Sequence, residues 1–294
     1  MSDSKFTGMG VAIATPFRND GSIDFKAFEN HINYLIDNKV DYIVALGTTG
    51  ESVTLSKDEK RAVIDFAVEI INKRVPLVVG MGGYNTNELI SQIKSNVVDG
   101  IDAILSVAPY YNKPTQEGLY IHFKEISMAS PVPVILYNIP GRTGTNIDAD
   151  TILSLASNFQ NIIGVKEASG DFEHIMKIIK YKKKNFHVIS GDDLTTLPIV
   201  SIGGSGVISV IGNAFPGMFG KMVRLALDQK IEEARQMHYK FIDLINLLFV
   251  DGNPAGIKAT LHCLDLMENN LRLPLTPVGD DTYNKIKEVI KKVK

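Results

Sequence analysis

The sequence contains a single cysteine, Cys263, among its 294 residues. One thiol excludes a disulfide within the chain and a metal site built from several cysteines. Chains without disulfides are typical of reducing compartments, so we expect a cytoplasmic protein. Residues 1–5 contain no apolar stretch of the kind found in secretory signals, and we predict no such signal.

Neither sign of charge is in excess. The chain has 31 Lys and Arg residues against 33 Asp and Glu residues, a formal net charge of −2. Proteins that bind nucleic acids or anionic membrane surfaces usually carry a strongly basic field, so the composition predicts neither partner. With 45% hydrophobic and 22% charged residues, the chain is typical of globular proteins and long enough to bury a large core.

A long unbroken hydrophobic run is also missing. Residues 194–220 carry no charged side chain, and about 20 apolar residues suffice to span a bilayer. Pro198, Pro216 and several glycines interrupt this stretch, however. We therefore predict a buried helix, a tight turn, a buried strand and a loop instead of a membrane span.

Known cofactor motifs are absent as well. No GxGxxG or Walker A pattern occurs, and the six histidines show no metal-ligand spacing, so we expect no metal site. Cys263 lies in a helical pattern and is expected to be a buried structural thiol. Glycines 203, 204 and 206 could cradle a phosphate, but no basic residue between 194 and 220 supports that interpretation.

Eight short apolar runs rich in Val and Ile alternate with amphipathic segments. Apolar strands that alternate with helices are typical of a parallel sheet buried on both faces. Eight such units predict an α/β fold, the (β/α)8 TIM barrel, in preference to an open doubly wound sheet. Ser56 and Glu59 form a capping-box pattern before one of the helices. The expected strands are 10–14, 42–46, 77–80, 103–107, 134–137, 162–166, 187–190 and 206–210.

The pattern changes after the eighth run. Residues 217–227, 231–249, 255–267 and 281–293 are expected to be helical, with no strand between them. We therefore predict a catalytic barrel over residues 1–228 and a C-terminal helical domain over residues 229–294.

Lys166 lies at the end of the sixth expected strand, where barrel enzymes carry their catalytic groups. If Val165 packs against the helices, Lys166 points into the barrel mouth, because side chains alternate along a strand. A lysine there loses hydration, which favours the neutral, nucleophilic form that a Schiff base requires. The alternative is an exposed Lys166 paired with Glu167 in solvent.

Three other strand ends carry polar groups. Tyr137 ends the neighbouring strand, where its phenol could move protons at an imine on Lys166, or simply cap the core. Thr48 and Thr49 offer hydroxyls for a carboxylate or proton relay, although a plain turn would explain them equally well. Arg142, in the loop after Tyr137, could bind a carboxylate or lie solvated.

Five motifs occur together and in order: GTTGE, PYYNKPTQEG, LYNIPGRTG, GVKEASG and NPAGIK. With the flanking segments 10–17 and 271–277, they give the chain an end-to-end resemblance to the dihydrodipicolinate synthase family, within the N-acetylneuraminate lyase superfamily. The resemblance implies condensation of pyruvate with L-aspartate 4-semialdehyde to 4-hydroxy-tetrahydrodipicolinate, in diaminopimelate and lysine biosynthesis. It also implies a cytoplasmic homotetramer built as a dimer of dimers.

The resemblance assigns roles to individual residues. Lys166 would form a covalent imine with pyruvate, without a separate cofactor, and Tyr137 would donate and accept protons. Thr48 would form a proton relay with Tyr111, which would reach into the site of the neighbouring subunit. The same resemblance gives Thr49 and the backbone of Ile208 to pyruvate, and Arg142 to the carboxylate of the semialdehyde.

Two alternative functions were weighed against the synthase. A pyruvate-dependent aldolase acting on a sugar acid such as N-acetylneuraminate would share Lys166 and Tyr137, but Arg142 favours a short carboxylated aldehyde. A non-catalytic small-molecule sensor would not need a lysine that forms an imine.

The family resemblance also covers an allosteric pocket for lysine. Ser52, Glu88 and Tyr110 match the pattern of lysine-inhibited members. Lys57 and Lys60 stand where those members tend to have histidines, and Tyr84 stands where they have asparagine. Because two lysines would repel a cationic effector, we predict weak or absent inhibition by lysine.

Overall fold

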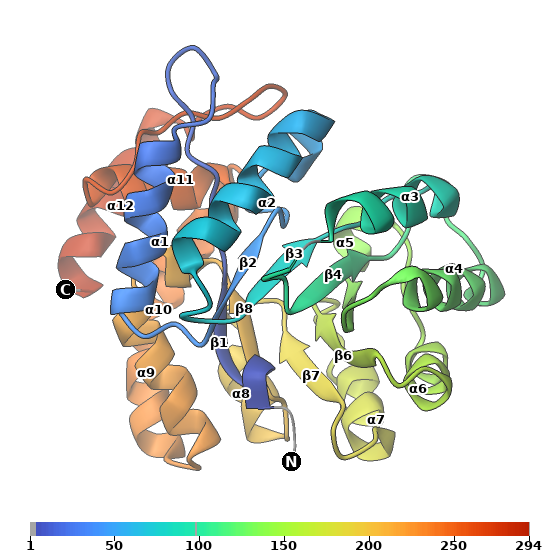
Figure 1. The fold of residues 1–294 in the computed structure, drawn as a ribbon. Helices are drawn as coiled ribbons and strands as arrows, with labels where there is room; N and C mark the ends of the chain where they lie inside the picture. Colours follow the sequence, from blue (N-terminus) through green and yellow to red (C-terminus); the bar gives the residue numbers. More distant parts are fainter. Residues whose placement is uncertain (1–3, 98, 294) are drawn as a thin grey trace.

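The computed structural model describes residues 4–97 and 99–293. Within these residues, eight parallel strands pair in chain order, and β8 pairs with β1 to close a barrel (Figure 1). The predicted TIM barrel is thereby confirmed. β1 begins two residues before its predicted start, and the other strands begin where predicted. The strands are β1 (Gly8–Ala12), β2 (Tyr42–Ala45), β3 (Leu77–Gly80), β4 (Ala103–Val107), β5 (Val134–Asn138), β6 (Ile162–Glu167), β7 (His187–Ser190) and β8 (Gly206–Ser209).

Helices connect the strands and cover the outside of the barrel (Figure 1). Local sequence explains where they begin. Ser56 accepts a hydrogen bond from Glu59 N, and the Glu59 side chain accepts one from Ser56 N, so the predicted capping box is confirmed. The helices are α1 (Phe25–Asp37), α2 (Lys57–Ile71), α3 (Thr86–Asn96), α4 (Gln116–Ala129), α5 (Pro140–Thr143), α6 (Ala149–Asn158), α7 (Phe172–Tyr181), α8 (Thr196–Ser201) and α9 (Pro216–Leu227), with short 3-10 helices η1 (Ser4–Phe6), η2 (Ser52–Thr54) and η3 (Ile211–Asn213).

The lower, N-terminal end of the barrel is filled by side chains. Phe6 packs edge-to-face against Tyr42, with ring centroids 5.7 Å apart, and both side chains are buried. Gly10 makes room for this packing, because a Cβ there would lie 2.1 Å from the Tyr42 ring. The open end, where the strands terminate, is left for a binding site.

Three helices follow α9: α10 (Ile231–Val250), α11 (Ala255–Cys263) and α12 (Asp280–Val293). α10 lies alongside α9, on one flank of the barrel (Figure 1). α11 ends earlier than predicted, because Asp265 adopts a left-handed conformation with φ of 57°. Cys263 is partly exposed, so its predicted burial was wrong. The division into domains at residue 228 stays a prediction.

The charge-free stretch 194–220 forms the predicted helix and strand, α8 and β8, and the 3-10 helix η3 lies where a loop was predicted, before α9 begins. Gly206 has φ of 134°, and a Cβ at this position would lie 1.9 Å from Gly8 O. The close approach of β8 to β1 therefore accounts for this glycine without a bound phosphate. Among the described residues, no helix is long and apolar enough to cross a membrane.

The burial of His31 and His122 is expected to make the folded protein less stable in acid. Burial lowers the pKa of His31 to about 4, against the opposing effect of its hydrogen bond with Asn213, and burial lowers the pKa of His122 to about 4. In the unfolded chain histidine titrates near pH 6.5. Below that pH the unfolded state therefore binds protons that the folded state refuses, and the stability present above pH 6.5 is lost as the pH falls toward 4.

We expect the free energy of unfolding to fall by a few kcal/mol between pH 7 and pH 4.5, partly because of these two residues. Urea unfolding of the wild type and of His31→Gln across this range measures their share. The substitution should lower stability at pH 7 and flatten the pH dependence. An unchanged slope would contradict the prediction.

Candidate active site

A cavity of about 480 Å³ opens at the C-terminal ends of the strands. Apolar side chains from β1, β2 and β4 form its floor, and polar side chains come from β5, β6 and the loops and helices above them. Besides Lys60, it brings together six other residues singled out from the sequence. These are Thr48, Ser52, Tyr110, Tyr137, Arg142 and Lys166. Thr49, Glu88, Tyr111 and Ile208 do not line it.

Lys166 lies near the end of β6, and only 5% of its surface is exposed. Val165 belongs to the core between strands and helices, whereas Lys166 lines the cavity, as alternation along the strand requires. Glu167 is buried on the outer side with its own partners. The alternative of an exposed Lys166–Glu167 pair was therefore wrong.

Tyr137 faces Lys166 across the strand pair. The two residues are register partners on β5 and β6, and Lys166 Nζ lies 4.3 Å from the centroid of the Tyr137 ring. Among the described residues, no carboxylate forms an ion pair with this amine. The amine is therefore held next to a phenol in a site largely removed from water.

Gly191, directly after β7, leaves space for the lysine side chain. A Cβ at this position would lie 3.2 Å from Lys166 Cε and 2.7 Å from Ala168 Cβ. The Gly191 N–H donates a hydrogen bond to Glu167 O over 2.7 Å, so the backbone at Gly191 cannot easily move away from Lys166. The sequence analysis missed Gly191, because the contact joins residues from different strands.

We expect Gly191→Ala to lower turnover by about 100-fold, because it displaces Lys166 and small misplacements at a reacting centre have effects of that size. Steady-state kinetics with a thermal unfolding scan measures this. Gly279→Ala is the matched control, since a Cβ there meets nothing within 4 Å. Equal turnover in the two variants would contradict the prediction.

The Thr48–Thr49 turn follows β2. Gly50 N donates to Gly47 O and Glu51 N to Thr48 O, each over 3.1 Å, which fixes a tight turn. Thr48 lines the cavity. Thr49 is 2% exposed, and its hydroxyl accepts a hydrogen bond from Asn253 Nδ2 at 3.1 Å.

A buried ion pair supports this turn from behind. Glu51 and Lys258 meet at 2.5 Å, with both side chains fully buried, and Arg272 N donates to Glu51 Oε2. Burial lowers the pKa of Lys258 to about 8, although the charge of Glu51 opposes this shift. Lys258 is the lysine of the NPAGIK motif, so the C-terminal segment anchors the loop that carries Thr48.

Arg142 lies on the short helix α5, not in a loop as expected. Its side chain is largely exposed at the cavity rim, and Nη2 donates to Asn253 O at 3.3 Å. Asn253 thus contacts both Thr49 and Arg142, two residues expected to hold carboxylates. The sequence analysis missed Asn253, because its neighbours lie more than 100 positions away.

Tyr111 points away from the cavity of its own chain. It is 91% exposed and adopts a left-handed backbone with φ of 72°. Its neighbour Tyr110 lines the cavity and packs edge-to-face with Tyr84, with centroids 5.3 Å apart. Burial raises the pKa of Tyr110, and the nearby Tyr84 and Glu88 add to the shift.

The model of the Dihydrodipicolinate synthetase family matches residues 5–293. The chain belongs to this family. The 4-hydroxy-tetrahydrodipicolinate synthase of Flavobacterium psychrophilum is 52% identical over 281 residues, covering 96% of each chain. That of Parabacteroides distasonis is 50% identical over 293 residues, covering 100% of this chain and 99% of the relative. The crystal structure of dihydrodipicolinate synthase from Aquifex aeolicus is 41% identical and superposes with a TM-score of 0.95, covering 98% of each chain.

In this member of the Dihydrodipicolinate synthetase family, charged residues of α2 and α3 meet at the rim of the cavity. Lys57 forms an ion pair with Glu88 at 3.6 Å. Lys60 lines the cavity, and its partial burial lowers its pKa, as does the charge of Lys57, although Glu88 opposes the shift. Ser52 lies on η2 at the same rim.

The described part of the chain contains no candidate metal site. In residues 4–97 and 99–293, no group of three or more His, Cys, Asp or Glu side chains could hold a metal ion.

Ile208 on β8 is buried in the inner core of the barrel, next to Gly10 in register.

Proposed function

We propose that this chain condenses pyruvate with L-aspartate 4-semialdehyde to 4-hydroxy-tetrahydrodipicolinate, a lyase reaction of diaminopimelate and lysine biosynthesis. The observation that carries the proposal is the buried amine of Lys166 beside the Tyr137 ring in the cavity. The names of the family relatives support this reaction over a sugar-acid aldolase or a non-catalytic sensor.

Lys166 supplies the nucleophile. Its neutral amine adds to the ketone carbon of pyruvate, and loss of water leaves an imine, so the covalent link to substrate takes the place of a separate cofactor. Loss of a proton from the pyruvate methyl group then gives an enamine, whose carbon attacks the aldehyde of the second substrate and regenerates the imine. The amino group of the second substrate then adds to the imine carbon, which closes the ring and expels the Lys166 amine. Tyr137 moves the protons at the imine, and Thr48 is within the same cavity to relay them.

In this proposal, different residues bind the carboxylates of pyruvate and of the semialdehyde. The Thr49 turn and the Ile208 backbone bind pyruvate, whereas Arg142 receives the carboxylate of the semialdehyde. Arg142 uses one guanidinium N–H on Asn253 O, so other donors of its planar fork stay available to a carboxylate. The hydrogen bonds of Asn253 with Thr49 and Arg142 fix the positions of these two residues relative to each other.

The same proposal includes a homotetramer, built as a dimer of dimers in the cytoplasm. The exposure of Tyr111 supports a contribution to a neighbouring subunit, since this tyrosine cannot serve its own cavity from its present position. Analytical ultracentrifugation measures the assembly state.

Borohydride reduction in the presence of pyruvate, followed by peptide mass analysis, tests the mechanism. A pyruvate-derived adduct on Lys166 is expected. Turnover of aspartate semialdehyde is then compared with cleavage of N-acetylneuraminate. Absence of the adduct would overturn the mechanism, and faster cleavage of the sugar acid would favour the aldolase.

We predict that lysine binds weakly or not at all at Ser52, Glu88 and Tyr110. Glu88 already forms an ion pair with Lys57, so this carboxylate is not available to the ammonium group of a lysine effector. The ammonium of Lys60 lies at the same rim and would repel the effector. Calorimetric titration with lysine measures the affinity. Double substitution Lys57→Ala with Lys60→Ala should strengthen it, and micromolar binding to the unmodified chain would contradict the prediction.

A further inference from the structure

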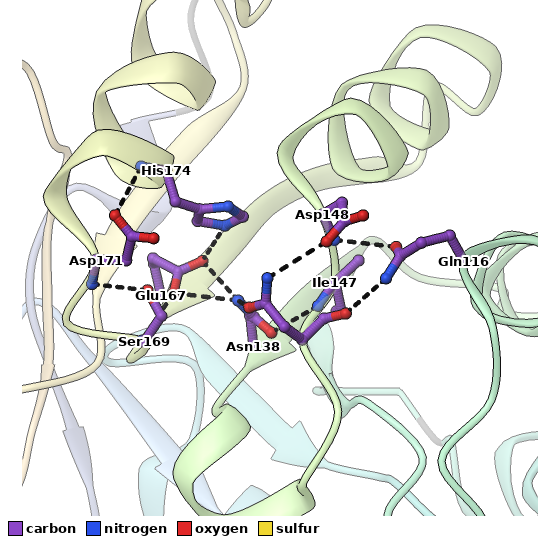
Figure 2. A network of polar contacts seen from close by, with 9 residues as sticks. Gln116, Asn138, Ile147, Asp148, Glu167, Ser169, Asp171 and His174 are labelled. Carbon is purple, nitrogen blue, oxygen red and sulfur yellow. Dashed lines mark hydrogen bonds and ion pairs between the residues drawn. The ribbon is translucent and has the colours of Figure 1, made fainter.

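A buried polar network includes Asn138 and Glu167, the residues that follow Tyr137 and Lys166 along their strands (Figure 2). Asn138 follows Tyr137 at the end of β5, and Glu167 follows Lys166 at the end of β6. Asn138 is 0% exposed and Glu167 1% exposed. Because side chains alternate along a strand, the same backbone that aims Tyr137 and Lys166 inward aims these two outward.

Three groups donate hydrogen bonds to the Glu167 carboxylate (Figure 2). Asn138 Nδ2 lies 3.2 and 3.1 Å from its two oxygens, Ser169 N lies 2.8 Å from Oε1, and His174 Nε2 lies 3.1 Å from Oε2. Burial alone would lower the pKa of His174, but the hydrogen bond and charge of Glu167, with the charges of Asp171 and Asp148, raise it. Asn138 Oδ1 in turn accepts from Ile147 N at 3.0 Å.

The polar network joins β5 and β6 at the last pair of their register, near the mouth. Tyr137 pairs with Lys166 and Asn138 with Glu167, but the register shifts between Val134 and Ile135 lower in the same pair. Above this shift, the four pairs from Ile135–Gly164 to Asn138–Glu167 follow one another without interruption, and the Glu167 network lies at their upper end. A slip of β6 by one residue would turn Lys166 out of the barrel, and a slip of β5 would do the same to Tyr137.

We propose that Glu167 is a positioning residue that holds Lys166 and Tyr137 in reactive alignment by clamping Asn138, Ser169 and His174 from outside the barrel. The inference rests on the proposed Schiff-base function of Lys166. Glu167 does not touch the cavity, so it acts only through the two strands that it joins.

A carboxylate suits this position better than an amide. Three donors converge on it, and an ionised carboxylate only accepts hydrogen bonds. Glutamine has the same shape, but its NH₂ group would face at least one of these donors in a buried site, where an unmatched polar group is costly.

Glu167→Gln therefore tests the proposal, with exchange of the pyruvate methyl protons into deuterated water as the readout. Exchange requires both the imine and the correctly placed proton carrier, but not the second substrate. We expect exchange and turnover to slow by about 10- to 100-fold, while KM for pyruvate changes less and the borohydride adduct on Lys166 still forms.

Asn161→Ala is the matched control for a merely structural effect. Asn161 Nδ2 donates to Ser127 O at 2.8 Å at the opposite end of β6, so its loss lowers stability far from the mouth. Exchange should stay at the wild-type rate below the unfolding temperature. Equal exchange rates in Glu167→Gln and the wild type would overturn the proposal, as would equal slowing in Asn161→Ala.

If Glu167→Gln does not fold, His174→Asn removes one donor and should slow exchange in the same direction; an unchanged rate would overturn the proposal. A wild-type chain without a pyruvate adduct would instead overturn the proposed function.

Discussion

Replacement of Lys166 by methionine is expected to remove turnover, by about 10⁴-fold or more, as when other covalent nucleophiles are deleted. Methionine retains a long flexible side chain but has no amine to add to the ketone of pyruvate. Since Lys166 is 5% exposed and makes no ion pair among the described residues, the fold does not depend on its charge. The unfolding temperature should therefore change little or rise.

Two measurements check this expectation together. Steady-state kinetics should show no turnover above background, and borohydride with pyruvate should leave the chain without an adduct. Lys180→Met is the matched control, because Lys180 is an exposed residue of α7 that lies over the Tyr181 ring, away from the cavity. Substantial turnover in Lys166→Met, or an adduct on another lysine, would contradict the mechanism.

Tyr137→Phe is expected to lower turnover by about 10²- to 10⁴-fold, the usual contribution of a positioned acid–base group. The ring that faces Lys166 Nζ at 4.3 Å remains, so pyruvate should still form its imine. Only the phenolic hydroxyl is lost. The variant should therefore keep the borohydride adduct while the proton-transfer steps slow.

Tyr34→Phe provides a matched loss of one hydroxyl. Tyr34 donates to Ala214 O at 2.9 Å on the outside of the barrel, so its substitution costs stability without touching the cavity. Turnover should stay near the wild-type rate in this control. A Tyr137→Phe enzyme with wild-type turnover would assign the proton transfers to another group.

Much of the active site could be predicted from the order of the strands and from the alternation of side chains along each strand. Lys166 and Tyr137 end adjacent strands, and a parallel barrel brings such ends to one mouth. Gly191, Asn253 and Glu167 could not be recognised in this way. The room that Gly191 leaves for Lys166 depends on how closely β7 approaches β6, and Asn253 reaches Thr49 from 204 positions away.

Pattern and composition by themselves determined the barrel, all of its strand starts except that of β1, and the pair of residues suited to imine chemistry, because those features depend on short-range periodicity. The single cysteine and the scattered histidines pointed in the same direction, since they offered no spaced ligands for a metal. Only the tertiary structure decided which groups surround Lys166. Burial and hydrogen bonding join residues far apart in the chain, and the packing of strands against one another sets distances that no local pattern encodes.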